Sequence, residues 1–104
     1  MEALEKKVYL NQLFELYGAL LTKKQAQSFL YYYVDDYSLQ EIAEIFSVSR
    51  NAIYDQLQKV EKHLLDYESK LHLYEKQQNR EKRIKQLEKQ LDASIIEIIR
   101  KLDE

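Results

Sequence analysis

Six side chains near the middle of the chain have the types and spacing of a surface that contacts nucleic acid. Arg and Asn side chains can form two-point hydrogen bonds with guanine and adenine edges, and Lys side chains bind phosphates. Arg50 and Asn51 directly follow Ser49, at the start of a helical pattern. We expect them to read bases, with Lys59 and Lys62 on the backbone. The predicted nucleic-acid-binding set is Arg50, Asn51, Tyr54, Gln58, Lys59 and Lys62.

The charge around this set is nearly balanced. Between Ser49 and His63, the basic residues Arg50, Lys59 and Lys62 stand against Asp55 and Glu61, and two more acids, Glu41 and Glu44, precede them. Because phosphate contacts supply much of the affinity for nucleic acid, this balance does not favour tight binding. A packing scaffold or a protein-binding surface is therefore an alternative interpretation of the same residues.

A second basic set lies further along the chain, where six cations stand against Glu81 and Glu88. On a helix these cations spread around much of the circumference, which is typical of a solvated face with i,i+4 ion pairs. An arm that binds RNA backbone or other phosphates is the alternative. The set is Lys76, Arg80, Lys82, Arg83, Lys85 and Lys89.

The sequence offers little for catalysis. His63 and His72 are far apart in helical register, the chain has no cysteine, and its single glycine cannot build a phosphate-binding loop. The serines at 38, 47 and 49 are explained by helix capping and turn formation. We therefore predict no enzymatic activity, no metal site and no cofactor.

The elements that must position Arg50 and Asn51 form a helix-turn-helix pattern over residues 38–61. Ser38 and Glu41 make a capping box for the first helix, and Ser49 caps the second. Small Ala43 marks the point where the helices approach closely. Ser47 stands where many such turns have glycine, which indicates a strained or altered turn. The expected inner face of the second helix is Ala52, Ile53, Leu57 and Val60.

Two further helices are predicted before this motif. The first covers residues 2–17, and we expect Gly18 to end it in the left-handed conformation. Thr22 and Gln25 form another capping box, which opens a helix that reaches about Val34. Its expected buried face is Ala26, Phe29, Leu30 and Tyr33, and one or two of the tyrosines at 31–33 should be partly exposed.

The C-terminal part is almost wholly helix-forming. The second helix of the motif should run to about Tyr67 or merge into the next helix, with Glu68–Ser69 as a candidate joint and residues 77–79 as a candidate bend. Apolar residues then recur at three- and four-residue steps, as in a coiled coil. A long helix needs a partner for such a seam, and we predict a homodimer. Its expected interface is Ile84, Leu87, Leu91, Ile95, Ile98 and Leu102.

Composition supports an all-α fold, with a helix-turn-helix bundle at 1–67 and a C-terminal helical dimerisation arm at 68–104. The 104 residues include no proline, one glycine and 33% charged residues, with a formal charge of −2. No apolar run approaches the roughly 20 residues that span a bilayer, and the N-terminus lacks a signal-peptide pattern. We predict a cytoplasmic protein without membrane insertion.

The segment LTKKQAQSFLYYYVDDYSLQEIAEIFSVSRNAIYDQLQKVEKHL resembles region 4 of bacterial sigma factors. A narrower resemblance, carried most specifically by YYVDDYSLQEIAEIFSVSRNAIYDQLQKVEKHLLDYESKLHL, is to the YlxM/p13-like family, also called UPF0122. Genes of that family commonly neighbour the gene of the signal recognition particle GTPase. The resemblance implies a regulatory part in that targeting pathway and places Arg50, Asn51 and Tyr54 where a sigma-like helix faces DNA.

These observations favour a non-catalytic regulatory protein that binds DNA or RNA and takes part in the signal recognition particle pathway. One alternative is an accessory protein that binds the particle's RNA or its GTPase through the basic C-terminal helix. Another is a dimeric protein-binding scaffold.

Overall fold

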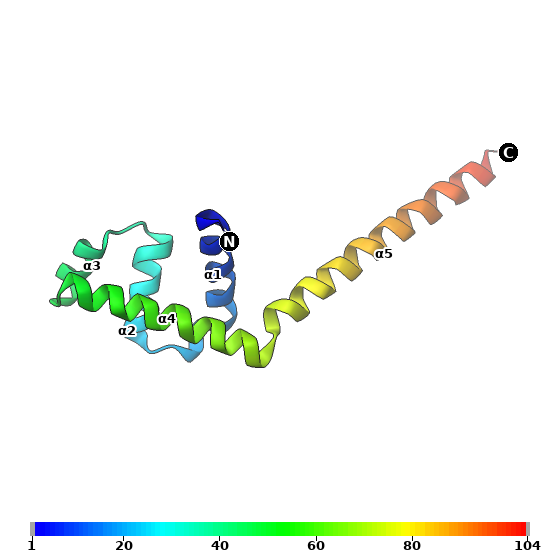
Figure 1. Ribbon diagram of the computed structural model, residues 1–104. Helices are drawn as coiled ribbons and strands as arrows, with labels where there is room; N and C mark the ends of the chain where they lie inside the picture. Colours follow the sequence, from blue (N-terminus) through cyan, green and yellow to red (C-terminus); the bar gives the residue numbers. More distant parts are fainter. Residues whose placement is uncertain (1, 104) are drawn as a thin grey trace. The chain divides into compact units, whose positions relative to one another are not determined.

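A computed structural model describes residues 2–103, and every regular element in that range is helical, which confirms the all-α fold (Figure 1). The chain divides into two compact units, Met1–His72 and Leu73–Glu104. The first unit contains α1 (Ala3–Tyr17), η1 (Gly18–Leu20), α2 (Lys23–Phe29), η2 (Leu30–Val34), α3 (Leu39–Phe46) and α4 (Arg50–Leu71). The second unit contains α5 (Leu73–Leu102).

Helix α1 packs on α4 through Leu10, Leu13 and Tyr17, which are almost completely buried. The prediction for Gly18 was wrong in its backbone conformation. Gly18 is right-handed, with φ −56° and ψ −32°, and the chain continues into the 3₁₀ turn η1. A Cβ on Gly18 would lie 3.3 Å from the Phe14 ring, so the absent side chain leaves room for that ring.

Helix α2 begins at the predicted capping box between Thr22 and Gln25. Phe29 is buried near its end and stacks on Phe14, with ring centroids 4.4 Å apart. The next residues form the π-helical turn η2, in which the Asp35 amide donates to the Leu30 carbonyl oxygen at 2.9 Å. This wider turn shifts the α-helical register of the residues after Leu30, and Leu30 itself is 38% exposed instead of buried.

Helices α3 and α4 form the predicted helix-turn-helix. Both predicted caps are present: the Glu41 amide donates to the Ser38 hydroxyl oxygen, and the Ala52 amide donates to the Ser49 hydroxyl oxygen. Buried Ala43 and Ile42 pack with residues of α4 in a single apolar cluster, whose other buried members are Ile53 and Leu57. Ala52, in contrast, is exposed, because the buried positions of α4 follow from Ile53 at helical spacing.

The turn between α3 and α4 is built around Ser47 in the left-handed conformation, with φ 56° and ψ 45°. The Ser47 and Val48 amides donate to carbonyl oxygens of the last turn of α3. Non-glycine residues pay a steric penalty in this conformation. The strain predicted at Ser47 is therefore present in the structure.

Helix α4 extends past Glu68–Ser69, where the sequence suggested a joint, and ends at Leu71 before left-handed His72. Glu68 holds this last part against the bundle because it is buried and accepts a 2.6 Å hydrogen bond from the Tyr17 hydroxyl. The Ser69 hydroxyl donates to the Asp66 carbonyl oxygen and caps nothing downstream. The unit boundary thus falls at His72, five residues beyond the expected position.

Helix α5 is one continuous helix from Leu73 to Leu102, without a break at residues 77–79. None of its residues is buried. The predicted seam residues are all exposed, by 46% at Ile95 to 79% at Leu102.

Candidate nucleic-acid interface

The buried residues of α4 define which of its side chains face outward. Ile53, Leu57, Val60 and Leu64 have at most 5% of their surface exposed and line the inner face. Because residues three and four apart share a helix face, Asn51, Asp55, Lys59 and Lys62 fall on the opposite side, joined by Gln58 on its flank. All five are exposed.

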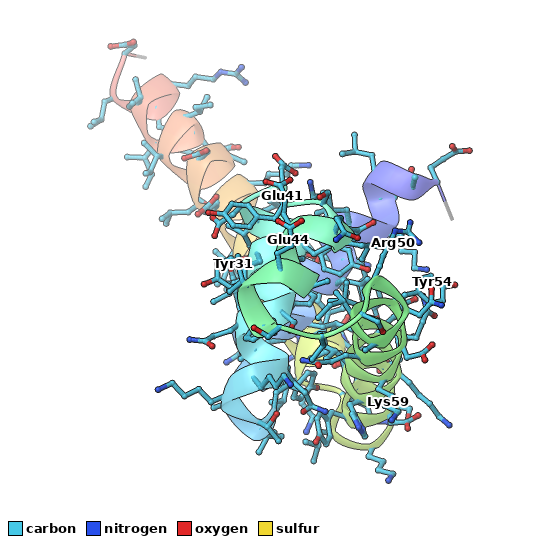
Figure 2. The ribbon with its side chains drawn as sticks, turned by 90° about the vertical axis from the view of Figure 1, so that its left-hand side faces the viewer. Tyr31, Glu41, Glu44, Arg50, Tyr54 and Lys59 are labelled. Carbon is cyan, nitrogen blue, oxygen red and sulfur yellow. The ribbon has the colours of Figure 1, made fainter. Side chains whose placement is uncertain are left out.

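Arg50 and Asn51 occupy the first turn of α4, which the Ser49 cap and the Ser47 turn hold in place. Both side chains are exposed, and Tyr54 is 50% exposed one turn later. Figure 2 shows Arg50, Tyr54 and Lys59 along α4, whereas Glu41 and Glu44 lie on α3. The structure therefore places the whole predicted set on one exposed helix whose first turn is held by a cap.

An ion pair changes the charge balance of this helix. Glu61 binds Lys6 of α1, with 2.7 Å between Oε1 and Nζ, and its side chain is only 14% exposed. The hydrogen bond and the attraction of Glu61 raise the pKa of Lys6. Since Glu61 faces α1, the outward side of α4 between Asn51 and Lys62 carries Lys59 and Lys62 against Asp55.

A surface groove of about 440 Å³ runs between the start of α2 and the outward side of α4. Thr22, Lys24 and Gln25 line it from one side, and Gln56 joins the walls by donating to the Lys24 carbonyl oxygen and the Ser28 hydroxyl. The remaining lining residues are Ala52, Asp55 and Lys59. The α2 side of this surface was missed by the sequence interpretation.

A signal for the α2 contribution does exist in the sequence. Lys23 and Lys24 stand in the first turn of α2, which has no acidic residue. A helix dipole disfavours cations at this end, so these two lysines do not stabilise the helix. The ammonium group of Lys24 lies 5.5 Å from the Phe46 ring centroid, and this contact holds it beside the helix-turn-helix.

Glu41 and Glu44 keep negative charge on α3. The Ser38 amide donates to the Glu41 carboxylate at 3.0 Å, and the bonds with Ser38 hold the pKa of Glu41 below its usual value. Glu44 accepts from the Gln40 side chain at 3.4 Å. These carboxylates disfavour phosphate next to α3, so α4 and the start of α2 are the more favourable side for an anion.

The second basic set lies on α5, in the other unit. All six cations from Lys76 to Lys89 are exposed. They are spread around the helix as expected, and the set offers no single concave surface. Exposure agrees equally with a solvated face and with an RNA-binding arm.

The two histidines considered for catalysis, His63 and His72, are not assembled into a site. His63 stacks on Tyr67, with ring centroids 6.3 Å apart. Across residues 2–103, no three His, Asp or Glu side chains are grouped so that they could hold a metal ion. Over the same described range, no helix has both the length and the apolar character needed to cross a membrane.

Comparison with known proteins supports the helix-turn-helix interpretation. A sequence model of the family described as "Putative helix-turn-helix protein, YlxM / p13 like" (UPF0122) matches residues 4–103. UPF0122 proteins of Streptococcus gordonii and Streptococcus pneumoniae are 58% identical to the chain over 71 residues, which is 68% of this chain. The match spans 64% of the length of these curated relatives, slightly less than two thirds.

Proposed function

Because the chain belongs to the UPF0122 family of helix-turn-helix proteins, we propose that it is a non-catalytic regulatory protein that binds nucleic acid through α4. The observation that carries the proposal is the ion pair between Lys6 and Glu61. It takes one of the two opposing acids away from the outward side of α4 and leaves a net positive surface there. A helix with a fixed first turn and a positively charged outward side fits the major groove of a duplex.

In this proposal, Arg50 and Asn51 contact base edges from the first turn of α4. Lys59 and Lys62 contact phosphates, and Lys23 and Lys24 at the start of α2 add phosphate contacts beside the groove. Tyr54 and Gln58 lie between the two groups and contact sugars or base edges. Asp55 on the same face disfavours phosphate nearby and restricts which bases are accepted, because a carboxylate accepts a hydrogen bond from cytosine.

We place this activity in the cytoplasm and, as the family resemblance implies, in the signal recognition particle pathway. A second copy of the chain pairs through α5, so that the dimer presents two recognition helices to two half-sites. The apolar seam from Ile84 to Leu102, exposed along its whole length, supports this pairing.

Fluorescence anisotropy against random duplex DNA and against the particle's RNA, each over a salt series, tests the proposal. We expect salt-sensitive binding to the duplex. Replacing Lys59 and Lys62 together by Ala should weaken it at every sequence and lower the salt slope by about 2, because each phosphate contact contributes about 1. Arg50→Ala should reduce preference among sequences. Lys70→Ala, which removes a cation from the end of the same helix, is the matched control.

The exposed cations of α5 support a second candidate function, an accessory protein that binds the particle's RNA or its GTPase. In that case the RNA binds more tightly than the duplex. Charge reversal at Arg80, Lys82 and Arg83 then abolishes binding, whereas Arg50→Ala has little effect. If neither nucleic acid binds at low salt, the helix-turn-helix acts as a dimeric protein-binding scaffold.

A further inference from the structure

The apolar residues of α5 form a continuous stripe that the chain's own unit leaves uncovered. We call Ile84, Leu87, Leu91, Ile95, Ile98 and Leu102 the α5 stripe. Each is 46–79% exposed. An exposed apolar stripe of this length on a soluble helix indicates an interaction surface.

The stripe has a coiled-coil register with one irregularity. Successive members are three, four, four, three and four residues apart. With Ile84 at position a and Leu87 at position d of a heptad, the extra four-residue step falls between Leu91 and Ile95. Such an insertion locally unwinds a left-handed supercoil but keeps the stripe on one face.

The two flanks of the stripe carry opposite charges. Flank e, on one side, has the acids Glu81, Glu88 and Asp92, followed by Ile99. Flank g, on the other side, has the cations Lys76, Arg83 and Lys101, with neutral Gln90 and Ser94 between them. All of these side chains are exposed. A helix that covers the stripe must therefore have its own apolar seam. It must also place basic residues opposite flank e and acidic residues opposite flank g.

We propose that a second copy of α5 covers the stripe in the parallel orientation. In a parallel pair, each g residue faces the e residue five positions further along the partner helix. Arg83 then faces Glu88 of the second copy. In an antiparallel pair, e faces e and g faces g, so the register that sets Leu87 beside Ile98 brings Asp92 near Asp92 of the second copy and Arg83 near Lys101 of the second copy.

This inference rests on the pairing in the proposed function and adds its orientation. In a parallel pair, both chains enter the coiled coil at Leu73, so both helix-turn-helix units are joined to the same end. An antiparallel pair would attach them at opposite ends of helices that are roughly 45 Å long. Parallel pairing makes two neighbouring half-sites accessible to one dimer.

Disulfide cross-linking of the full chain tests the orientation, since the natural sequence has no cysteine. In a parallel dimer, Leu87→Cys meets itself and Ile98→Cys meets itself, so each variant cross-links alone under mild oxidation. In an antiparallel dimer, equivalent positions are roughly 16 Å apart, and only a mixture of the two variants cross-links. That second pattern, or a trimer mass by light scattering, would overturn the proposal.

Charge exchange gives an independent test. Arg83→Glu and Glu88→Arg should each raise the dimer dissociation constant about tenfold, since each reversal creates two symmetric repulsive contacts. The double variant should restore wild-type association. Lys89→Glu, on the side opposite the stripe, is the matched control and should change the dimer dissociation constant little. A double variant as weak as the singles would contradict the parallel contacts.

These experiments use no nucleic acid, so their results do not depend on whether the chain binds nucleic acid. Antiparallel cross-links would contradict the parallel orientation and leave the anisotropy results on Arg50 and Lys59 unaffected. Absence of duplex binding would leave parallel cross-links equally informative.

Discussion

Ten apolar residues are buried among residues 2–72 of the first unit, whereas α5 buries none although its seam has similar spacing. In the first unit, the chain turns back several times, and α1, α2 and α3 all contact α4. In α5, the helix continues for 30 residues without a turn. Helical periodicity alone therefore specifies which residues face one side, while the turns decide whether the same chain covers them.

The difference also concerns what each region needs to be stable. The bundle has an internal core, so we expect its stability to be independent of protein concentration. The proposed α5 pair forms between chains, so its stability must depend on concentration. Variants that act on one region and not on the other test this distinction.

The largest expected effect is on association. Replacing Ile95 and Ile98 together by Asp places four charges in the proposed interface, where their desolvation is costly. We expect a monomer at concentrations where the wild type is dimeric, measured by analytical ultracentrifugation, with an unchanged melting temperature for the bundle. A dimer that persists would show that its interface lies elsewhere in the chain.

The next effect is on the bundle core. Leu13→Ala removes a side chain with no exposed surface and should lower the free energy of unfolding by roughly 3 kcal/mol. Leu91→Ala removes the same atoms from a 63% exposed position and serves as the control. Chemical denaturation at low protein concentration should show almost no loss for the control. Equal losses would mean that the two regions are stabilised alike.

A smaller gain is expected at the turn between α3 and α4. Ser47→Gly relieves the steric cost of the left-handed backbone and should stabilise the bundle by about 1 kcal/mol. Ser69→Gly makes the same change inside α4 and should destabilise it by about 0.5–1 kcal/mol. Thermal denaturation of the two variants should therefore shift in opposite directions. A loss at both positions would contradict the strain at Ser47.

The smallest effect concerns pH. Burial of the ring, followed by the nearby Glu61 carboxylate, raises the pKa of Tyr33 to about 12 from its usual 10.0. The unfolded chain therefore loses the Tyr33 proton first, so its contribution to stability is complete below pH 10 and is lost as pH rises toward 12. Ultraviolet titration should show one fewer late-ionising tyrosine in Tyr33→Phe than in the wild type. Tyr32→Phe is the control, and it should leave that late step in place.

Local signals were sufficient for much of the fold. The caps at Thr22, Ser38 and Ser49 were predicted from residue types three positions apart, because each cap depends on hydrogen bonds within one helical turn. The crossing at Ala43 was predicted because a small side chain allows close helix approach. The candidate interface could also be placed on α4 from local signals alone, although its function stays a prediction.

The errors have both local and long-range causes. Gly18 was expected to be left-handed, but it is right-handed and lies beside the Phe14 ring. Leu30 was expected to be buried, but it is exposed at the start of the π turn. The joint expected at Glu68–Ser69 is absent because Glu68 is held by Tyr17, which is 51 positions away in the chain.

By itself, the sequence determined the helices, their caps, the inner face of α4 from Ile53 onward and the apolar stripe of α5, since each depends on residues within a few turns. Only the tertiary structure decided the charge of the α4 surface. Lys6 lies in α1, and nothing in the local pattern around Glu61 reveals that these two side chains meet. Long-range ion pairs depend on how helices pack, and packing is set by the whole core and not by any one segment.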